Sequence, residues 1–212
     1  MKQIKNAHIF EHPLITHKLA IMRDKNTQPK DFRRLVNEIA TLMVYEITKD
    51  LPTKEVEIET PIKKATFKVL DDTPITLVPI LRAGLGMLDG FQAMLPDARV
   101  GFMGVYRDAQ THEPIEYYCK MPADVADNIV FVLDPMFATG GSACAALDKL
   151  KERGCKKLCM VCMVAAPEAI DRVYAEHPDV PIYAAALDER LNENAYIVPG
   201  LGDAGDRIFG TL

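Results

Sequence analysis

The sequence predicts an α/β fold: a doubly wound, mostly parallel sheet with N-terminal helices and a long β-arm or hood. Continuous apolar runs at 75–81, 129–133, 158–165 and 182–187 have the composition of parallel strands buried on both faces. Helical stretches separate these runs along the chain. Such alternation implies right-handed crossovers and a sheet whose ligands gather at the carboxyl ends of its strands.

A chain of 212 residues, 49% hydrophobic and 26% charged, is long enough to bury a sizeable core. We therefore interpret residues 1–212 as one domain. No apolar run approaches the roughly 18 residues of a membrane-spanning helix, and the first ten residues lack the apolar core of a signal peptide. These features lead us to expect a soluble, cytoplasmic protein without a membrane partner.

The charge balance argues against a nucleic-acid partner. The formal net charge is -5, whereas non-specific nucleic-acid binding depends on a basic surface that releases counterions. A small-molecule partner is therefore expected. The five cysteines suit reduced thiols better than a disulfide framework. Cys159 and Cys162 form a C-x-x-C within an apolar strand, where residues three apart point to opposite faces, so we interpret them as buried fillers.

The first thirty residues are expected to form loops and a short helix. His8, His12 and His17 are closely spaced there, but Pro13 interrupts any helix that could align them, so packing and hydrogen bonding are favoured over metal binding. Residues 31–49 have apolar side chains at the three-and-four spacing of an amphipathic helix, for which Asp31 is the expected cap.

A strand pair or ribbon is expected between residues 56 and 69, broken by Pro61 and placed at the periphery of the main sheet. The next apolar run, 75–81, leads into Arg82, Ala83 and Gly84 and then into a helical stretch that ends at Met94. An arginine at the carboxyl end of a strand, followed by small residues, suits an anion-binding loop, because its forked guanidinium matches diphosphate oxygens. An exposed surface arginine is the simpler alternative.

Residues 99–106 are expected to form another strand, and residues 106–122 a flexible lid or arm. This connection is long and polar, and such connections in compact domains usually belong to active sites.

The strand at 129–133 is followed by Asp134, Pro135 and a segment rich in glycine and hydroxyl residues, 138–142, that opens a helix at Ser142. Gly154 is a suitable C-cap for that helix. Backbone N–H groups at a helix N-terminus favour a phosphate group, whereas the Asp134 carboxylate suits sugar hydroxyls, directly or through a metal. A phosphorylated sugar satisfies both. Neither a Walker loop nor a dinucleotide fingerprint fits, and a simple tight turn explains only one of the glycines.

The last segment, 196–211, contains four glycines but is too apolar for a disordered tail. Together with the central loop it carries a family resemblance. The sequence Asp-Pro-Met-Phe-Ala-Thr-Gly-Gly-Ser at 134–142 resembles the phosphoribosyl-diphosphate (PRPP) loop of type I phosphoribosyltransferases. Most of that superfamily has two adjacent acids before the loop, but Pro135 stands in the second place, as it does in the uracil phosphoribosyltransferases.

The similarity to this family extends along most of the chain. It includes His-Pro-Leu and Thr-His-Lys-Leu near the N-terminus, Tyr-Arg-Asp in the expected lid, and Tyr-Ile-Val-Pro-Gly-Leu-Gly-Asp-Ala-Gly-Asp at 196–206. In the lid, Ala109, Gln110, His112 and Cys119 are looser matches.

The resemblance implies a transferase that makes UMP and diphosphate from uracil and PRPP, with Mg2+ bound with the PRPP and no metal held by the protein alone. It implies catalytic roles for Asp134, Arg107 and Asp203. The residues that it assigns to PRPP are Arg82, Arg107, Asp134, Pro135, Met136, Phe137, Ala138, Thr139, Gly140, Gly141, Ser142 and Asp203. Those that it assigns to uracil are Ile197, Gly202, Asp203 and Ala204. It also suggests a homodimer or higher homo-oligomer and, as in some bacterial members, activation by GTP at a site that the sequence does not locate.

The choice of base can also be argued from hydrogen bonding. Uracil has one N3–H donor between two carbonyl acceptors, which a backbone offering N–H, C=O and N–H can pair completely. Cytosine has an acceptor at N3 and a donor at N4, so the same backbone would leave polar groups unpaired. Each buried unpaired polar group costs roughly 1 to 3 kcal/mol. Three groups are candidate acceptors of the uracil N1 proton: Asp203, water and the diphosphate. The rival function, an RNA-binding regulator built on the same fold, would need a basic face.

Overall fold

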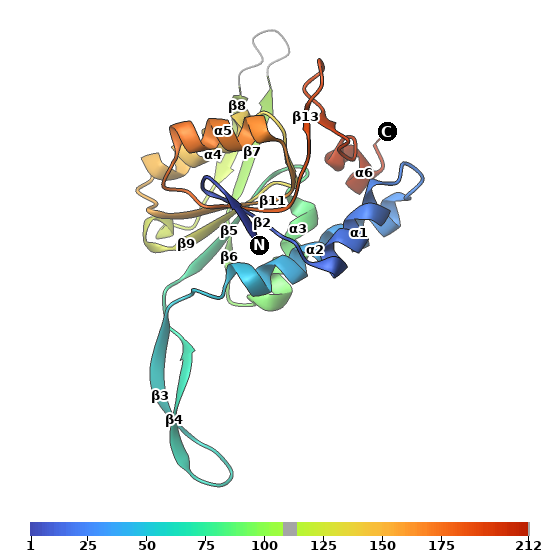
Figure 1. The fold of residues 1–212 in the computed structure, drawn as a ribbon. Helices are drawn as coiled ribbons and strands as arrows, with labels where there is room; N and C mark the ends of the chain where they lie inside the picture. The colour runs from blue at the N-terminus through green and yellow to red at the C-terminus, as the bar shows by residue number, and fades with distance from the viewer. Residues whose placement is uncertain (108–113, 212) are drawn as a thin grey trace.

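A mostly parallel sheet organises the computed structural model, which describes residues 1–107 and 114–211 (Figure 1). Its strands lie in the order β1 (Lys2–Ile4), β2 (Ala7–Ile9), β12 (Ile182–Leu187), β11 (Lys157–Ala165), β9 (Ile129–Leu133), β5 (Ile75–Leu81), β7 (Phe102–Arg107) and β8 (Pro114–Lys120). The first and last pairs are antiparallel and the pairs between them are parallel. Two short strands, β6 (Arg99–Val100) and β10 (Met136–Phe137), pair with β5 and β11.

The direction of winding reverses between β5 and β9. From β5 the chain passes through α3 (Leu85–Met94) to β7, and from β9 it passes through α4 (Gly141–Glu152) to β11 on the other side. The predicted doubly wound fold is thereby confirmed. In such sheets the carboxyl ends of the strands at the reversal leave a crevice between their loops.

Side chains that alternate along the strands form a core on each face of the sheet. Leu77 and Phe131 belong to one core, with residues of α1 (Pro13–Arg23), α2 (Pro29–Ile47), α3 and α6 (Ala204–Phe209). Val78 and Val132, the next residues along, belong to the other core, with residues of α4 and α5 (Pro167–Glu176). The same alternation places Cys159 and Cys162 in different cores, which confirms their interpretation as buried fillers, and burial raises the pKa of both thiols.

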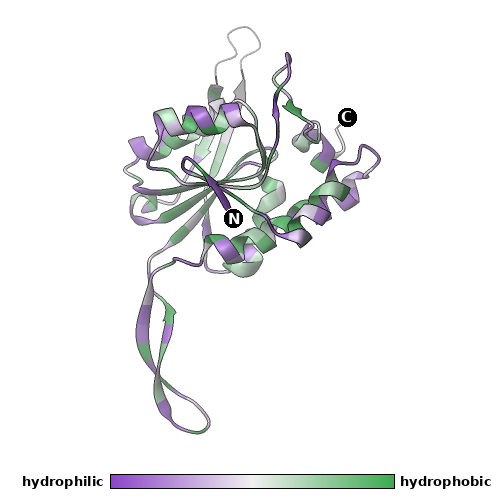
Figure 2. Ribbon diagram, viewed as in Figure 1, coloured by the Kyte–Doolittle hydropathy of each residue, from purple (hydrophilic) through white to green (hydrophobic). Residues whose placement is uncertain are grey.

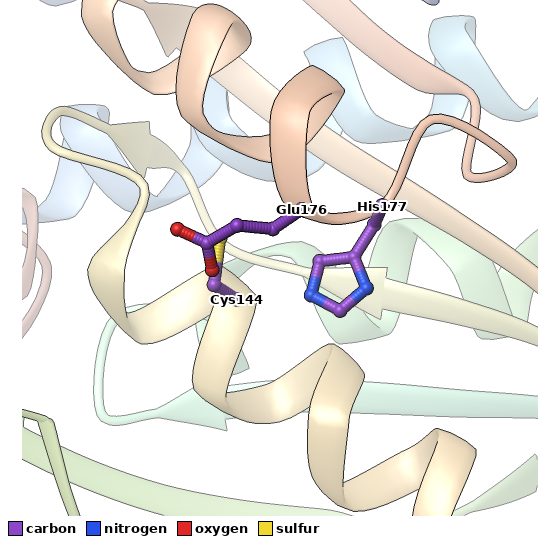
Figure 3. Close-up of side chains that lie close together, drawn as sticks. All are labelled: Cys144, Glu176 and His177. Carbon is purple, nitrogen blue, oxygen red and sulfur yellow. The ribbon is translucent and has the colours of Figure 1, made fainter.

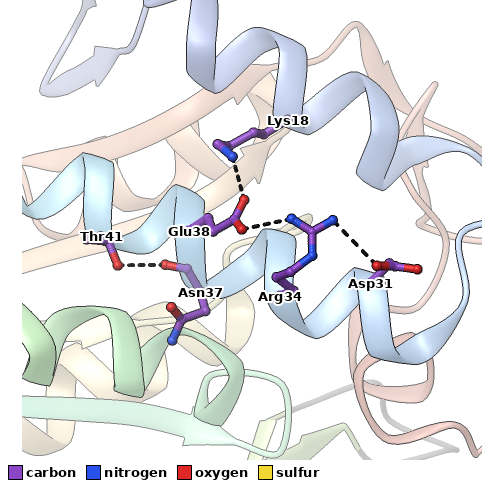
Figure 4. Close-up of polar contacts among 6 residues, drawn as sticks. All are labelled: Lys18, Asp31, Arg34, Asn37, Glu38 and Thr41. Carbon is purple, nitrogen blue, oxygen red and sulfur yellow. Dashed lines mark hydrogen bonds and ion pairs between the residues drawn. The ribbon is translucent and has the colours of Figure 1, made fainter.

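The N-terminal helices pack together through a polar cluster (Figure 4). Lys18 of α1 forms an ion pair with Glu38 of α2, and Glu38 also accepts a hydrogen bond from Arg34 at 2.8 Å. The prediction that Asp31 caps α2 is wrong. The helix begins at Pro29, after Gln28, because proline fits the first helical position, and Asp31 lies in the first turn, 3.4 Å from Arg34.

Two of the N-terminal histidines have local structural roles. The ring of His8 stacks on Tyr183 with 4.9 Å between the ring centroids. The pKa of His8 is lowered, chiefly by burial. His12 is the N-cap of α1, where its Nδ1 accepts a hydrogen bond from the Leu14 N–H at 3.2 Å. His17 is exposed on the same helix.

The strand pair expected near residues 56–69 forms, but its predicted place is wrong. Strands β3 (Thr53–Glu59) and β4 (Lys64–Leu70) make a sheet of their own, which projects far from the central sheet (Figure 1). Pro61 lies in the turn between the strands. Figure 2 shows hydrophobic segments on this arm, and Ile62 and Phe67 are among its exposed apolar side chains.

The expected lid at 106–122 is partly an edge of the central sheet. Residues 114–120 form β8, which pairs with β7, while residues 108–113, including Ala109, Gln110 and His112, lie outside the described residues. The strand expected at 99–106 is divided into β6 and β7 at Gly101. The remaining elements are η1 (Val125–Asp127), β13 (Arg190–Leu191) and β14 (Ile197–Val198). Among the described residues, no helix has the length and apolarity needed to cross a membrane.

Candidate functional site

The loops that follow β5 and β9 lie side by side at the reversal of the sheet. Pro79 pairs with Leu133, so Asp134 emerges level with Ile80 and close to the loop that begins at Arg82. The peptide bond between Leu81 and Arg82 is cis. Both of the loops predicted to bind anions are therefore on the same edge of the sheet.

Gly84 permits this close approach. A methyl group at this position would overlap the main-chain oxygen of Leu133 and would lie 2.7 Å from backbone atoms of Ile80. The Gly84 N–H also donates to the Ile80 carbonyl at 2.9 Å, which closes a tight turn at the end of β5. Since the obstructing atoms are backbone, side-chain movement cannot make room.

The loop at 138–142 presents the N-terminus of α4 to the site. The helix begins at Gly141, one residue before the predicted Ser142, and Gly140 precedes it with a φ of 76°. A residue with a Cβ is strained in this conformation, and the Gly140 Cβ would also lie 3.2 Å from the Ala169 carbonyl. The loop and Asp134 line a hollow of about 80 Å³. The N–H groups of the first helical turn and the positive end of the helix dipole suit this hollow to a phosphate group.

Two residues of the predicted loop contribute little side-chain surface. Pro135 is buried, and Phe137 packs in the core beneath α4. Their part in a ligand site is therefore limited to the backbone. Met136 is half-buried, and its N–H donates to Asp134 Oδ1 at 3.2 Å, which orients the carboxyl group at the end of β9.

Asp134 is held in an environment that disfavours its charge. Burial raises the pKa of Asp134 to about 7, and the nearby negative charge of Asp203 contributes in the same direction. The hydrogen bond from Met136 opposes these effects without cancelling them. The carboxyl group is therefore poised to change its charge when a cation or a hydrogen-bonding ligand enters.

The C-terminal segment completes the site from the side of β5. Asp203 caps α6 by accepting a hydrogen bond from the Asp206 N–H at 2.8 Å, and Arg82 donates to Asp206 Oδ1 at 3.1 Å. A Cβ on Gly205 would lie 3.8 Å from Arg82 Nη2. The fold thus gathers Arg82, Asp134 and Asp203, which are far apart in the sequence.

The four residues assigned to the base divide into two kinds. Gly202, with a φ of 80°, and Asp203 are exposed. Ile197 and Ala204 are buried in the core that contains α2. A ligand can therefore reach the main chain at 202–203, while the buried pair holds that main chain in place.

Residues that sequence patterns did not single out hold this segment. Arg23 forms a two-hydrogen-bond ion pair with Asp188, at 2.6 and 2.8 Å, and donates to the Gly200 carbonyl at 2.7 Å. Asp188 in turn accepts from the Gly200 N–H at 2.8 Å. Arg23 and Asp188 are 165 residues apart, so no local pattern could have paired them.

A second arginine, Arg207, is buried and supports the start of α6. Arg207 donates to the carbonyls of Leu201 and Asp24, at 2.8 and 2.6 Å, and its guanidinium lies 4.4 Å from the ring centre of Phe32. These contacts link the C-terminal segment to α2 and to the loop before it. For Arg107, the backbone ends β7 beside β5, and its side chain lies outside what the structure describes.

Comparison with known proteins gives consistent similarities. A sequence model of the family described as uracil phosphoribosyltransferase matches residues 9–211. The uracil phosphoribosyltransferase of Bacillus cereus is 59% identical over 96% of this chain and 98% of its own length, and so is that of Bacillus anthracis. The solved AQ2163 protein of Aquifex aeolicus is 39% identical, with a TM-score of 0.91 over 96% of this chain and 97% of its own.

A more distant structure resembles the fold alone. The purine phosphoribosyltransferase of Pyrococcus horikoshii superposes with a TM-score of 0.51 at 16% identity, over 72% of this chain and 82% of its own.

Replacement of Gly84 by alanine should destabilise the protein, because the added methyl group overlaps backbone atoms at the junction of the two loops. Overpacking of this kind costs about 1 to 3 kcal/mol or more. Gly86→Ala is the matched control, since its Cβ would meet side-chain atoms rather than backbone: Ile208 Cδ1 at 2.8 Å and Val36 Cγ1 at 3.2 Å. Denaturant unfolding checks the prediction, and equal free energies of unfolding for the two variants would contradict it.

Asp134→Asn should be more stable than the wild type at pH 8, and its advantage should be clearly smaller at pH 5. The folded state binds the Asp134 proton more tightly than the unfolded state, because the folded pKa is raised to about 7. The stability that this proton contributes is complete below the ordinary carboxyl pKa of about 4 and is lost as pH rises through the folded value.

Thermal unfolding at both pH values measures this difference. Asp89→Asn, on the exposed side of α3, is the control and should shift the melting temperature equally at both. A pH-independent effect of Asp134→Asn would show that the Asp134 charge is not destabilising in the fold.

Proposed function

The chain belongs to the uracil phosphoribosyltransferase family, and we propose that the loops at the β5–β9 reversal and the segment 196–211 carry out its reaction. The protein is a pentosyltransferase of pyrimidine salvage, converting uracil and PRPP to UMP and diphosphate. The observation that carries the placement is the meeting of an acid, a phosphate-sized hollow and an arginine at the point where the sheet reverses.

The ribose 5-phosphate occupies the hollow at the N-terminus of α4. There the main chain at 138–142 and the hydroxyls of Thr139 and Ser142 meet the phosphate oxygens. Asp134 then faces the ribose, where its carboxylate accepts hydrogen bonds from the sugar hydroxyls. Because a bound sugar replaces some of the water lost on burial, ligand binding favours the ionised form of Asp134.

The diphosphate faces the loop after β5. Arg82 is more than half exposed, and its contact with Asp206 leaves other guanidinium N–H groups for phosphate oxygens. Arg107 is assigned to the same group because β7 neighbours β5 and because of its place in the Tyr-Arg-Asp sequence. Both arginines neutralise charge that grows on the leaving group as the bond to ribose C1 breaks.

Uracil lies against the exposed main chain at 202–203. Gly202 allows the backbone to approach a planar ring closely, and main-chain N–H and C=O groups there match the acceptor, donor, acceptor edge of uracil. The network of Arg23, Asp188 and Arg207 keeps this backbone rigid, so it cannot adapt to a different base. Positioning of N1 near ribose C1 supplies much of the rate.

Mg2+ suits the charges of this site. The negative charge of Asp203 contributes to the raised pKa of Asp134, so a divalent cation arriving with PRPP would relieve this repulsion. Both offer the oxygen ligands that Mg2+ prefers. When bound, Mg2+ neutralises the diphosphate and helps to orient the ribose hydroxyls. For the N1 proton, Asp203 is our first candidate acceptor, with its Oδ1 already engaged by Asp206.

We place this reaction in the cytoplasm, because all five cysteines, which lie within the described residues, are free thiols. We also propose a homo-oligomer. The β3–β4 arm carries exposed apolar side chains far from the central sheet, and these would be buried against a second copy. Activation by GTP is proposed from the family alone.

Purified protein supplied with PRPP, Mg2+ and uracil should form UMP and release diphosphate. Cytosine should react at least about fivefold more slowly, because one buried unpaired polar group costs about 1 to 3 kcal/mol. Orotate and purines should also be poor substrates. Chromatographic separation of the nucleotide products measures the preference. Faster reaction of orotate or a purine would overturn the assignment of the base.

Arg82→Ala should raise the KM for PRPP at least tenfold and that for uracil much less, because a charge-assisted hydrogen bond contributes roughly 1.5 to 3 kcal/mol. Arg34→Ala is a matched control: Arg34 is as exposed as Arg82, at 54% against 55%, but lies on α2. Initial rates with each substrate varied in turn distinguish the two constants. Equal effects on both KM values would remove Arg82 from the PRPP site.

Light scattering should give the mass of a dimer or larger assembly, and Phe67→Asp should reduce it by placing a charge in the buried face of the arm. Lys68→Asp, at the adjacent exposed position, should leave the mass unchanged. Added GTP should lower the PRPP requirement or shift the assembly. A monomeric wild type whose mass and reaction rate do not change when GTP is added would contradict both the proposed homo-oligomer and the proposed activation by GTP.

A further inference from the structure

Three potential metal ligands lie close together near the start of α4 (Figure 3). None of them belongs to the residues proposed above for the transferase reaction. Cys144 lies in the first turn of α4, Glu176 is the last residue of α5, and His177 follows it. One ligand atom from each, the Cys144 sulfur, a Glu176 carboxylate oxygen and a His177 ring nitrogen, all lie within 4.8 Å of one another.

The side chain of His177 supplies a second observation, which does not depend on the distances within the cluster. Its side chain is almost completely buried, and neither ring nitrogen has a hydrogen-bond partner among residues 1–107 and 114–211. Leaving a buried polar group unsatisfied costs about 1 to 3 kcal/mol. Asp148 lies one helical turn after Cys144 on α4, and its Oδ1 is 3.5 Å from His177 Nε2, beyond a good hydrogen bond.

The combination of donors indicates which ion would fit. Thiolate, imidazole and carboxylate together are typical of Zn2+, which binds them at about 2.0 to 2.3 Å in a tetrahedron. Such ligand atoms are about 3.3 to 3.8 Å apart, so the side chains need to draw together by only about 1 Å. Mg2+ and Ca2+ prefer oxygen ligands and do not match the sulfur.

We propose that Cys144, Glu176 and His177 form a Zn2+ site that joins the start of α4 to the end of α5. Asp148 either orients the imidazole or, after rotation of its side chain, becomes the fourth ligand. In the binding step the sulfur–zinc bond replaces the S–H bond, and the thiol proton passes to solvent. Burial raises the pKa of Cys144 to about 12, so the group is a thiol until the metal arrives.

Arg172 occupies part of this space and competes with the metal. Its Nε donates to a Glu176 oxygen at 2.9 Å, which leaves the second carboxylate oxygen for Zn2+. The same guanidinium would lie 3.2 Å from a Cβ on Gly141. The cluster is therefore connected to the loop at 138–142, and a metal here would restrain the helix that carries this loop.

Titration of chelator-treated protein with Co2+ tests the site, because a thiolate bound to Co2+ gives near-ultraviolet charge-transfer absorption. We expect saturation at one Co2+ per chain, displacement by Zn2+ but not by Mg2+, and a higher melting temperature with Zn2+. Cys144→Ser should abolish the charge-transfer band, and His177→Gln should weaken Zn2+ binding at least tenfold.

Cys119→Ser and His17→Gln, which replace the same residue types outside the cluster, should bind Co2+ like the wild type. Circular dichroism of each variant establishes that it is folded. The wild-type titration decides the question even where a variant fails to fold. Absence of the charge-transfer band in the wild type, or its persistence in Cys144→Ser, would overturn the proposal.

Discussion

The close packing of two strand ends at the reversal of the sheet is the constraint on which the site depends. Strands β5 and β9 are neighbours, and Gly84 lets the turn after β5 press against the backbone at the end of β9. This contact sets the loop that begins at Arg82 beside the loop that begins at Asp134. Because the contact joins backbone to backbone, it also makes the relative position of the two loops insensitive to side-chain motion.

At this junction the fold disfavours the ionised carboxylate of Asp134. Asp134 is enclosed at the carboxyl end of a buried strand and lies near Asp203, and both conditions raise its pKa. A neutral side chain would suit the fold better at neutral pH. The acid is useful because a substrate with hydroxyl groups and a cation converts an unfavourable charge into a set of binding contacts.

The C-terminal segment is held by arginines that are internal to the fold. Arg23 fixes Gly200 through Asp188, and Arg207 joins Leu201 to the loop before α2. The segment has little regular structure that could supply hydrogen-bond partners for its backbone carbonyls. The two arginines supply such partners instead. These contacts hold the main chain on the N-terminal side of the exposed residues 202–203.

The sequence by itself determined the elements whose causes are local. Apolar runs predicted the parallel strands, the glycine-rich segment after Asp134 predicted a helix start, and the resemblance along 134–142 and 196–206 indicated the family. Tertiary structure decided the rest: the arm at 53–70 forms a separate sheet, and Arg23 finds Asp188. The Cys144 cluster is another such meeting. Periodicity and capping act over a few residues, whereas these contacts join residues or elements that are distant in the chain, and only packing of the whole core selects them.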